Sequence, residues 1–89
     1  MEIAEAFGIV LRRNREKMGL SQEELALNCS LDRTFISLLE RGLRQPSLAT
    51  VFNIGEQLKM TSSELVRQVE RARKKGGRKT LPRLPSSRA

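Results

Sequence analysis

The sequence predicts an all-α protein, and three observations support this fold class. No segment alternates apolar and polar residues for long enough to indicate a strand. Apolar residues instead recur at three- and four-residue steps, which is the spacing of one face of a helix. Residue types that begin or end helices separate these stretches. We therefore expect five short helices joined by short turns.

The first predicted helix begins near Ile3 and ends before Gly19. Its apolar positions include Phe7, Leu11 and Met18, while most charged side chains fall on other faces. Glycine adopts the left-handed conformation that closes many helices, so Gly19 predicts the end of this one.

The second predicted helix begins after Ser21 and ends near Cys29. Ser21 and Glu24 have the spacing of a capping box, in which each side chain binds the backbone amide of the other residue. Leu25 and Ala26 are expected to face the core.

The third predicted helix covers about residues 33–41, between Asp32 and Gly42. The Asp32 carboxylate is expected to cap its first turn and to favour the positive end of the helix dipole. At 100° per residue, Phe35, Ile36 and Leu39 share one face. The opposite face then carries Arg33, Thr34, Ser37, Leu38 and Arg41.

The last two predicted helices begin after Ser47 and Thr61. Ser47 is a suitable capping residue, and Thr61 with Glu64 predicts a second capping box. The apolar positions of these helices are Leu48, Val51, Ile54 and Leu58 in the fourth, and Leu65, Val66, Val69 and Ala72 in the fifth.

The net charge of +7 is concentrated at the C-terminal end of the chain. Residues 1–70 contain nine basic and all ten acidic residues, whereas residues 71–89 contain eight basic residues and no acidic ones. The sequence therefore predicts a folded domain over residues 1–70 with a net charge of −1. Residues 71–89 form a basic tail with Gly, Pro and Ser, which we expect to be flexible because it has too few apolar residues to fold alone.

The composition argues against several classes of function. A single cysteine, no histidine and one aspartate predict no internal disulfide, no metal site and no cofactor. Glu40 has no nearby histidine, cysteine or second acid with which to do acid–base chemistry, so an enzyme is not expected. No stretch approaches the ~20 apolar residues that span a bilayer, and we expect a cytoplasmic protein with no membrane contact.

A four-residue connection, Cys29 to Asp32, joins the second and third predicted helices in the spacing of a helix-turn-helix. Residues 19–51 read GLSQEELALNCSLDRTFISLLERGLRQPSLATV and resemble the Xre/Cro-type repressor family. The resemblance covers about residues 5–68, and LDRTFIS is most similar to restriction-modification controller proteins. It implies a lambda-repressor-like five-helix domain that regulates transcription by binding double-stranded DNA.

The resemblance implies that residues 33–41 are a recognition helix in the major groove of a two-fold operator. An arginine there can donate two hydrogen bonds to guanine, and threonine or leucine can contact a thymine methyl group. Ser37 can reach a base edge or a phosphate. The base-reading side chains are thus predicted to be Arg33, Thr34, Ser37 and Leu38.

The resemblance also assigns residues that set the position of the recognition helix. Gln22 matches the family's phosphate-binding position, and the bases Arg41, Arg44 and Arg12 are further candidates for phosphate contacts. Arg15 and Glu40 match a family ion pair that orients the recognition helix. Ser30 and Lys59 stand where relatives often have glycine, which predicts ~1 kcal/mol of strain at each residue whose backbone is left-handed.

Besides DNA, the sequence leaves two kinds of protein partner open: a second copy of this chain and a different protein bound by the tail. The family expectation is a homodimer through the fifth helix and its surroundings, with Val66, Val69 and Phe52 as candidate interface residues. The alternative is an antitoxin-like protein whose basic tail binds a protein partner, with DNA binding for autoregulation. A third interpretation is a nucleic-acid-coating protein that binds mainly through the tail.

Overall fold

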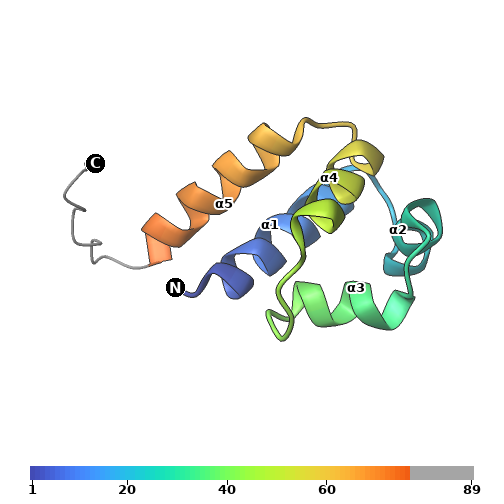
Figure 1. The fold of residues 1–89 in the computed structure, drawn as a ribbon, viewed down its shortest axis with the longest axis horizontal. Coiled ribbons are helices and arrows are strands. Elements are labelled where there is room, and N and C mark those ends of the chain that lie inside the picture. Colours follow the sequence, from blue (N-terminus) through green and yellow to red (C-terminus); the bar gives the residue numbers. More distant parts are fainter. Residues whose placement is uncertain (77–89) are drawn as a thin grey trace.

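The computed structural model describes residues 1–76 and consists over that range of five helices, which confirms the predicted fold class (Figure 1). Residues 77–89, most of the predicted tail, lie outside the described part of the chain. The helices are α1 (Ile3–Lys17), α2 (Gln22–Cys29), α3 (Arg33–Glu40), α4 (Leu48–Gln57) and α5 (Ser62–Gly76).

Helix α1 packs against two of the other four helices. It contacts α5 along one side, where the two helices run antiparallel, and α3 on another (Figure 1). Helix α2 contacts both α3 and α4, and α4 also contacts α5. The position of α3 therefore depends on its contacts with α1 and α2.

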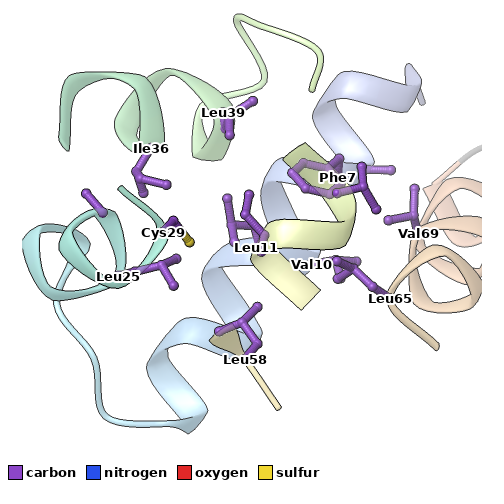
Figure 2. Close-up of a cluster of buried hydrophobic side chains, with 14 residues drawn as sticks. Phe7, Val10, Leu11, Leu25, Cys29, Ile36, Leu39, Leu58, Leu65 and Val69 are labelled. Atoms are coloured by element: carbon purple, nitrogen blue, oxygen red, sulfur yellow. The ribbon is translucent and has the colours of Figure 1, made fainter. Parts of the chain in front are cut away.

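The core is aliphatic, with Phe7 as its only fully enclosed aromatic residue among those described. Leu11 lies at its centre, with Leu25 and Ile36 approaching from α2 and α3 (Figure 2). Three of the apolar positions predicted from periodicity, Met18, Leu48 and Val66, are exposed instead. Met18 follows the last residue of α1 and Leu48 is the first residue of α4, so neither of these two is enclosed by a full helical turn.

The predicted helix ends at Gly19 and Gly42 are confirmed, with φ angles of 73° and 74°. The capping box of α2 is complete: the Glu24 amide donates to Ser21 Oγ over 2.9 Å, and the Ser21 amide donates to Glu24 Oε1 over 2.8 Å. Ser47 caps α4 by accepting from the Thr50 amide over 3.1 Å.

Two capping predictions were wrong in part. Asp32 precedes α3 with extended backbone, but its carboxylate makes no capping hydrogen bond, so only its charge can favour the first turn. Thr61 Oγ1 does accept from the Glu64 amide over 3.1 Å. The Glu64 carboxylate, however, binds the side chains of Arg67 and Gln68, so the second capping box is only half formed.

The predicted domain boundary after residue 70 is also wrong, because α5 continues to Gly76. Ala72 packs against the core and holds this part of the helix to the body. Arg73, Lys74 and Lys75 lie in the last turn, where positive charge is favoured by the helix dipole. The first six residues of the predicted tail thus belong to the folded domain.

Both non-glycine residues singled out by the sequence adopt left-handed backbone, with φ angles of 57° at Ser30 and 59° at Lys59. Ser30 ends α2, and a side chain from α4 also binds this helix end. The Asn53 side chain in α4 donates to the Cys29 carbonyl oxygen over 2.8 Å, which satisfies one of the carbonyls that a helix end leaves free.

Helices α1 and α3 lie in direct backbone contact at Gly8. A Cβ atom at this position would lie 2.5 Å from the carbonyl oxygens of both Leu39 and Glu40. Because no real Cβ atom tolerates such a distance, glycine is required for the last turn of α3 to rest directly on the backbone of α1.

Candidate nucleic-acid interface

Helix α3 has one face in the core and one face toward solvent, as its sequence predicts. Ile36 and Leu39 are completely buried. Arg33 and Thr34 are exposed in the first turn, while Ser37 and Leu38 are half-buried one turn later. All four predicted base-reading side chains therefore lie away from the buried face of one helix, with the most accessible pair at its N-terminal end.

The last residue of α3 is tied to α1 by a two-point ion pair. Arg15 Nε donates to Glu40 Oε2 over 2.6 Å, and Arg15 Nη2 donates to Glu40 Oε1 over 2.9 Å. The two side chains are only 10% and 4% exposed, respectively. The hydrogen bonds from Arg15 to Glu40 raise the pKa of Arg15 against the opposing effect of burial. Arg15 and Glu40 thus form the ion pair that the resemblance implied.

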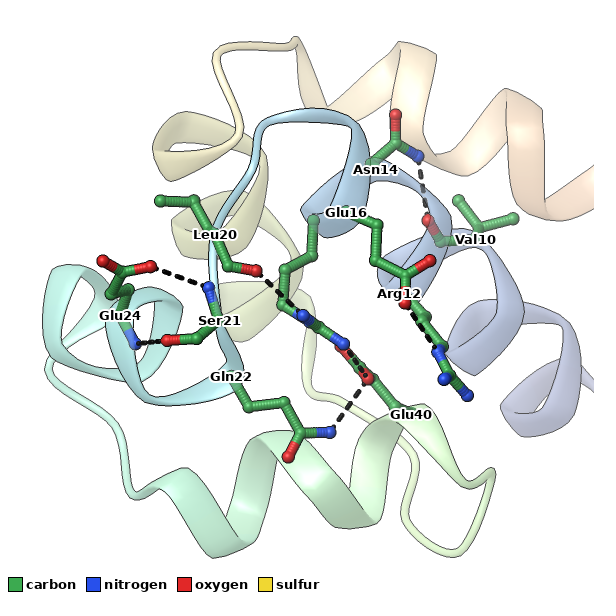
Figure 3. A network of polar contacts seen from close by, with 10 residues as sticks. Val10, Arg12, Asn14, Glu16, Leu20, Ser21, Gln22, Glu24 and Glu40 are labelled. Atoms are coloured by element: carbon green, nitrogen blue, oxygen red, sulfur yellow. Dashed lines mark hydrogen bonds and ion pairs between the residues drawn. The ribbon is translucent and has the colours of Figure 1, made fainter.

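Two further contacts complete this cluster (Figure 3). Gln22 Nε2 donates to Glu40 Oε1 over 3.0 Å, and Arg15 Nη1 donates to the Leu20 carbonyl oxygen over 2.8 Å. Sequence reasoning did not find either contact. Because Gln22 uses one of its two amide protons on Glu40, its side chain is held in place and keeps a second donor. We call Arg15, Leu20, Gln22 and Glu40 the helix 3 anchor.

The loop after α3 presents two exposed arginines, Arg41 and Arg44. The guanidinium of Arg44 lies over the ring of half-buried Phe35, 5.9 Å from its centroid. A cation over an aromatic face gains ~0.5–1 kcal/mol at an exposed site. The sequence placed Phe35 on the inner face of the helix and gave no sign of this contact.

Arg12 lies on the exposed side of α1, apart from the helix 3 anchor. Its Nε donates to Glu16 Oε2 over 3.1 Å, and both side chains are more than half exposed (Figure 3). Such surface pairs contribute little to stability, so Arg12 can exchange Glu16 for another anion at small cost.

Residues 11–65 match the family model described as helix-turn-helix, which covers α2, its turn and α3. The chain belongs to the helix-turn-helix family. It is also 42% identical over 66 residues to control protein C.MunI from Mycoplasma sp., a match that covers 73% of this chain and 89% of that protein.

Solved structures of helix-turn-helix controller proteins have the same fold. The restriction-modification controller protein C.AhdI from Aeromonas hydrophila superposes with a TM-score of 0.68 at 39% identity, covering 70% of this chain and 94% of its own. The controller protein C.Esp1396I, solved as a tetramer with its natural 35 base-pair operator, gives a TM-score of 0.73 at 25% identity, covering 81% and 95%.

Within this helix-turn-helix chain, the predicted dimer residues fall into two groups. Phe52 on α4 and Val66 on α5 are 55% and 43% exposed, and they line a shallow apolar depression with Thr61, Ser62 and Ser63. Val69 is 8% exposed and packs in the core, because it lies one turn from Leu65 on the face of α5 toward α1. The inclusion of Val69 among the interface residues was therefore wrong.

Cys29 is buried at the end of α2, and burial raises the pKa of its thiol. Its side chain packs in the core beside Leu25 and Ile36. Within residues 1–76, no cluster of three or more histidine, cysteine or acidic side chains is suited to a metal ion. None of the helices in this range has the length and apolar character needed to cross a membrane.

Proposed function

We propose that this protein is a sequence-specific DNA-binding transcriptional regulator that inserts α3 into the major groove. The observation that carries the proposal is the exposed Arg33 and Thr34 on a helix fixed by the helix 3 anchor, in a chain of the helix-turn-helix family. A structural neighbour bound to its operator supports the same conclusion.

Base reading is assigned to the solvent side of α3. Arg33 lies in the first turn, where it can donate two bonds to guanine O6 and N7. Thr34 and Leu38 offer methyl groups to thymine, and the Ser37 hydroxyl can bind a base edge or a phosphate. Each good two-bond contact discriminates between bases by ~1–3 kcal/mol.

Phosphate contacts are assigned to two sides of the recognition helix. Gln22 starts α2, where free backbone amides favour an anion and where Glu40 already orients its side chain. Arg41 and Arg44 lie in the loop after α3. Arg12 is the weakest of these assignments, because it is engaged by Glu16 on α1.

Homodimer formation is assigned to the exposed apolar surface of α4 and α5, which we call the Phe52/Val66 surface. A single helix-turn-helix unit reads few base pairs, and a two-fold dimer supplies a second half-site about one helical turn away. The depression is lined by the apolar side chains of Phe52 and Val66 and by small hydroxyl residues, so it can accept an apolar side chain from a second copy.

The deciding experiment is selection from random duplex DNA with the wild type, Arg33→Ala and the control Lys17→Ala. We expect the wild type and Lys17→Ala to recover the same motif. Arg33→Ala should bind that motif with ~1–3 kcal/mol less binding free energy, and it should lose the base preference at one position in each half-site. Recovery of the same motif by Arg33→Ala at unchanged affinity would contradict the assignment of α3.

A narrower regulatory role is favoured by the relatives. C.MunI and C.AhdI are controller proteins, and together they suggest control of restriction-modification genes. Genome-wide footprinting tests this: the selected motif should be occupied upstream of an endonuclease gene, and occupancy confined to unrelated promoters would exclude the role.

The antitoxin-like alternative depends on the basic C-terminal residues. Deletion of residues 77–89 separates the two proposals, because it leaves every described helix intact. A regulator should keep its motif and lose part of its salt dependence, in proportion to the phosphate contacts removed. Loss of a copurifying protein partner with the motif unchanged would favour the antitoxin-like function.

A further inference from the structure

The contact between α1 and α5 contains a buried polar side chain that the DNA-binding face does not use. Asn14 is only 8% exposed. Its Nδ2 donates to the Val10 carbonyl oxygen over 2.9 Å, within α1 (Figure 3). The same nitrogen donates to Gln68 Oε1 on α5 over 2.8 Å. Both amide protons of Asn14 are therefore used, one of them between helices.

Gln68 connects Asn14 to the beginning of α5. Gln68 Nε2 donates to Glu64 Oε2 over 3.1 Å, and Glu64 Oε1 accepts from Arg67 Nη1 over 3.0 Å. The Glu64 amide in turn donates to the Thr61 hydroxyl that precedes the helix. A continuous line of hydrogen bonds thus runs from the interior of α1 to the first turn of α5.

The remaining contact between these helices is apolar and specifies their angle only weakly. Leu65 and Val69 lie beside Phe7 and Val10 (Figure 2). Burial of such side chains is favourable in many orientations, because the hydrophobic effect is non-directional. Hydrogen bonds require a defined distance and angle. A single buried polar residue can therefore select one arrangement of two packed helices.

The angle of α5 on α1 relates the two functional surfaces of the protein. Helix α3 is fixed to α1 through Arg15 and Gly8, and α5 carries Val66. Any pivot of α5 on α1 would therefore move Val66, the α5 side of the Phe52/Val66 surface, relative to the recognition helix. In a dimer, this would change the separation of the two recognition helices.

We infer that Asn14 and Gln68 are a positioning pair that sets the half-site spacing of the operator. By fixing α5 on α1, they make a homodimer accept one separation of half-sites and reject neighbouring ones. The inference rests on the homodimer proposed above. It assigns no DNA contact to either residue, and it predicts an effect on spacing that is separate from the base sequence of each half-site.

The test uses duplexes that hold two inverted copies of the selected half-site, separated by spacers of graded length. Asn14→Leu/Gln68→Leu replaces the hydrogen bond with apolar groups, a change that is often neutral or stabilising. We expect the variant to keep the half-site motif, while its preference for the best spacing over its neighbours falls about fivefold or more. Gln68→Leu alone should act in the same direction, and it leaves Asn14 bonded to Val10.

Val69→Ala is the matched control, because it removes apolar contact between the same helices and leaves the positioning pair intact. It should lower the Tm and keep the wild-type spacing preference. The inference is overturned if Asn14→Leu/Gln68→Leu and Gln68→Leu keep that preference, or if Val69→Ala loses it equally. Failure of the dimer proposal would be visible in the wild type itself, which would bind one half-site as tightly as two.

Discussion

The helix 3 anchor and the Phe52/Val66 surface differ in how their side chains are satisfied. At the helix 3 anchor, a buried ion pair, an amide and a backbone carbonyl fix the end of α3 from inside the chain. At the Phe52/Val66 surface, apolar side chains face solvent beside small hydroxyl residues. The first region is complete within one copy of the chain, as a rigid reading helix requires. The second leaves apolar side chains exposed within one copy, as a surface that binds another copy would.

The largest effect is expected when the helix 3 anchor is broken. Glu40→Leu leaves the Arg15 charge almost buried without its partner, and such losses cost ~3–5 kcal/mol. Urea denaturation should show this decrease in the free energy of unfolding. Glu16→Leu is the control, because it removes the exposed partner of Arg12 and should change stability by less than ~1 kcal/mol. Equal losses in the two variants would show that the anchor contributes no more than a surface pair.

The second effect separates α3 from α1 without changing a charge. Gly8→Ala forces a Cβ atom against the last carbonyls of α3, and overpacking of this kind costs ~1–3 kcal/mol. Both the Tm and the affinity for the selected operator should fall, because the reading helix must shift. Gly55→Ala is a milder comparison, with its nearest new contact at 3.3 Å. A Gly8→Ala protein with wild-type stability would contradict the close approach of the two helices.

The third effect concerns the Phe52/Val66 surface. Phe52→Ala should weaken the dimer by ~1–2 kcal/mol, roughly tenfold in Kd, measured by sedimentation over a range of protein concentrations. Core burial is unaffected because Phe52 is largely exposed. Leu27→Ala removes a comparably exposed apolar side chain from α2 and should leave the dimer unchanged. If Leu27→Ala weakened dimer formation and Phe52→Ala did not, the interface would lie elsewhere.

The smallest effect concerns two strained residues in the turns that precede α3 and α5. Ser30 lies between α2 and α3, and Lys59 lies between α4 and α5, both with left-handed backbone. Ser30→Gly and Lys59→Gly should each stabilise the protein by ~0.5–1 kcal/mol, since relief of strain exceeds the added freedom of the unfolded chain. Thermal unfolding measures both changes, and a decrease in Tm would show that the native side chain contributes contacts that outweigh the strain.

Much of the fold could be predicted because its signals are local. Ser21, Ser47, Gly19 and Gly42 define helix ends through contacts within a few residues, and each behaves as its residue type predicts. Asp32 failed as a side-chain cap, because its carboxylate makes no bond to the first turn of α3. Periodicity placed Ala72 on the fifth helix, but the domain boundary was set at residue 70 from the charge distribution, which gave no weight to the contact between Ala72 and the core.

The candidate site could be predicted only in part. The exposed face of α3 could be predicted from the helical rotation of 100° per residue. The pairing of Arg15 with Glu40 could be predicted from the resemblance to the Xre/Cro-type family. Val69 lies one turn from Leu65 and shares its buried face, so helical periodicity already separated it from exposed Val66, and the interface prediction did not use this spacing. The contact of Arg44 with Phe35 also escaped prediction, because a loop conformation brings the two residues together.

By itself, the sequence determined the helices, their ends and the polar face of α3, because periodicity and capping depend on neighbours along the chain. Only the tertiary structure decided which of those faces are covered. It placed Gln22 against Glu40, joined Asn14 to Gln68 across 54 positions, and left Phe52 and Val66 in solvent. These outcomes depend on where whole helices lie against each other, and that arrangement is set by burial of the common core.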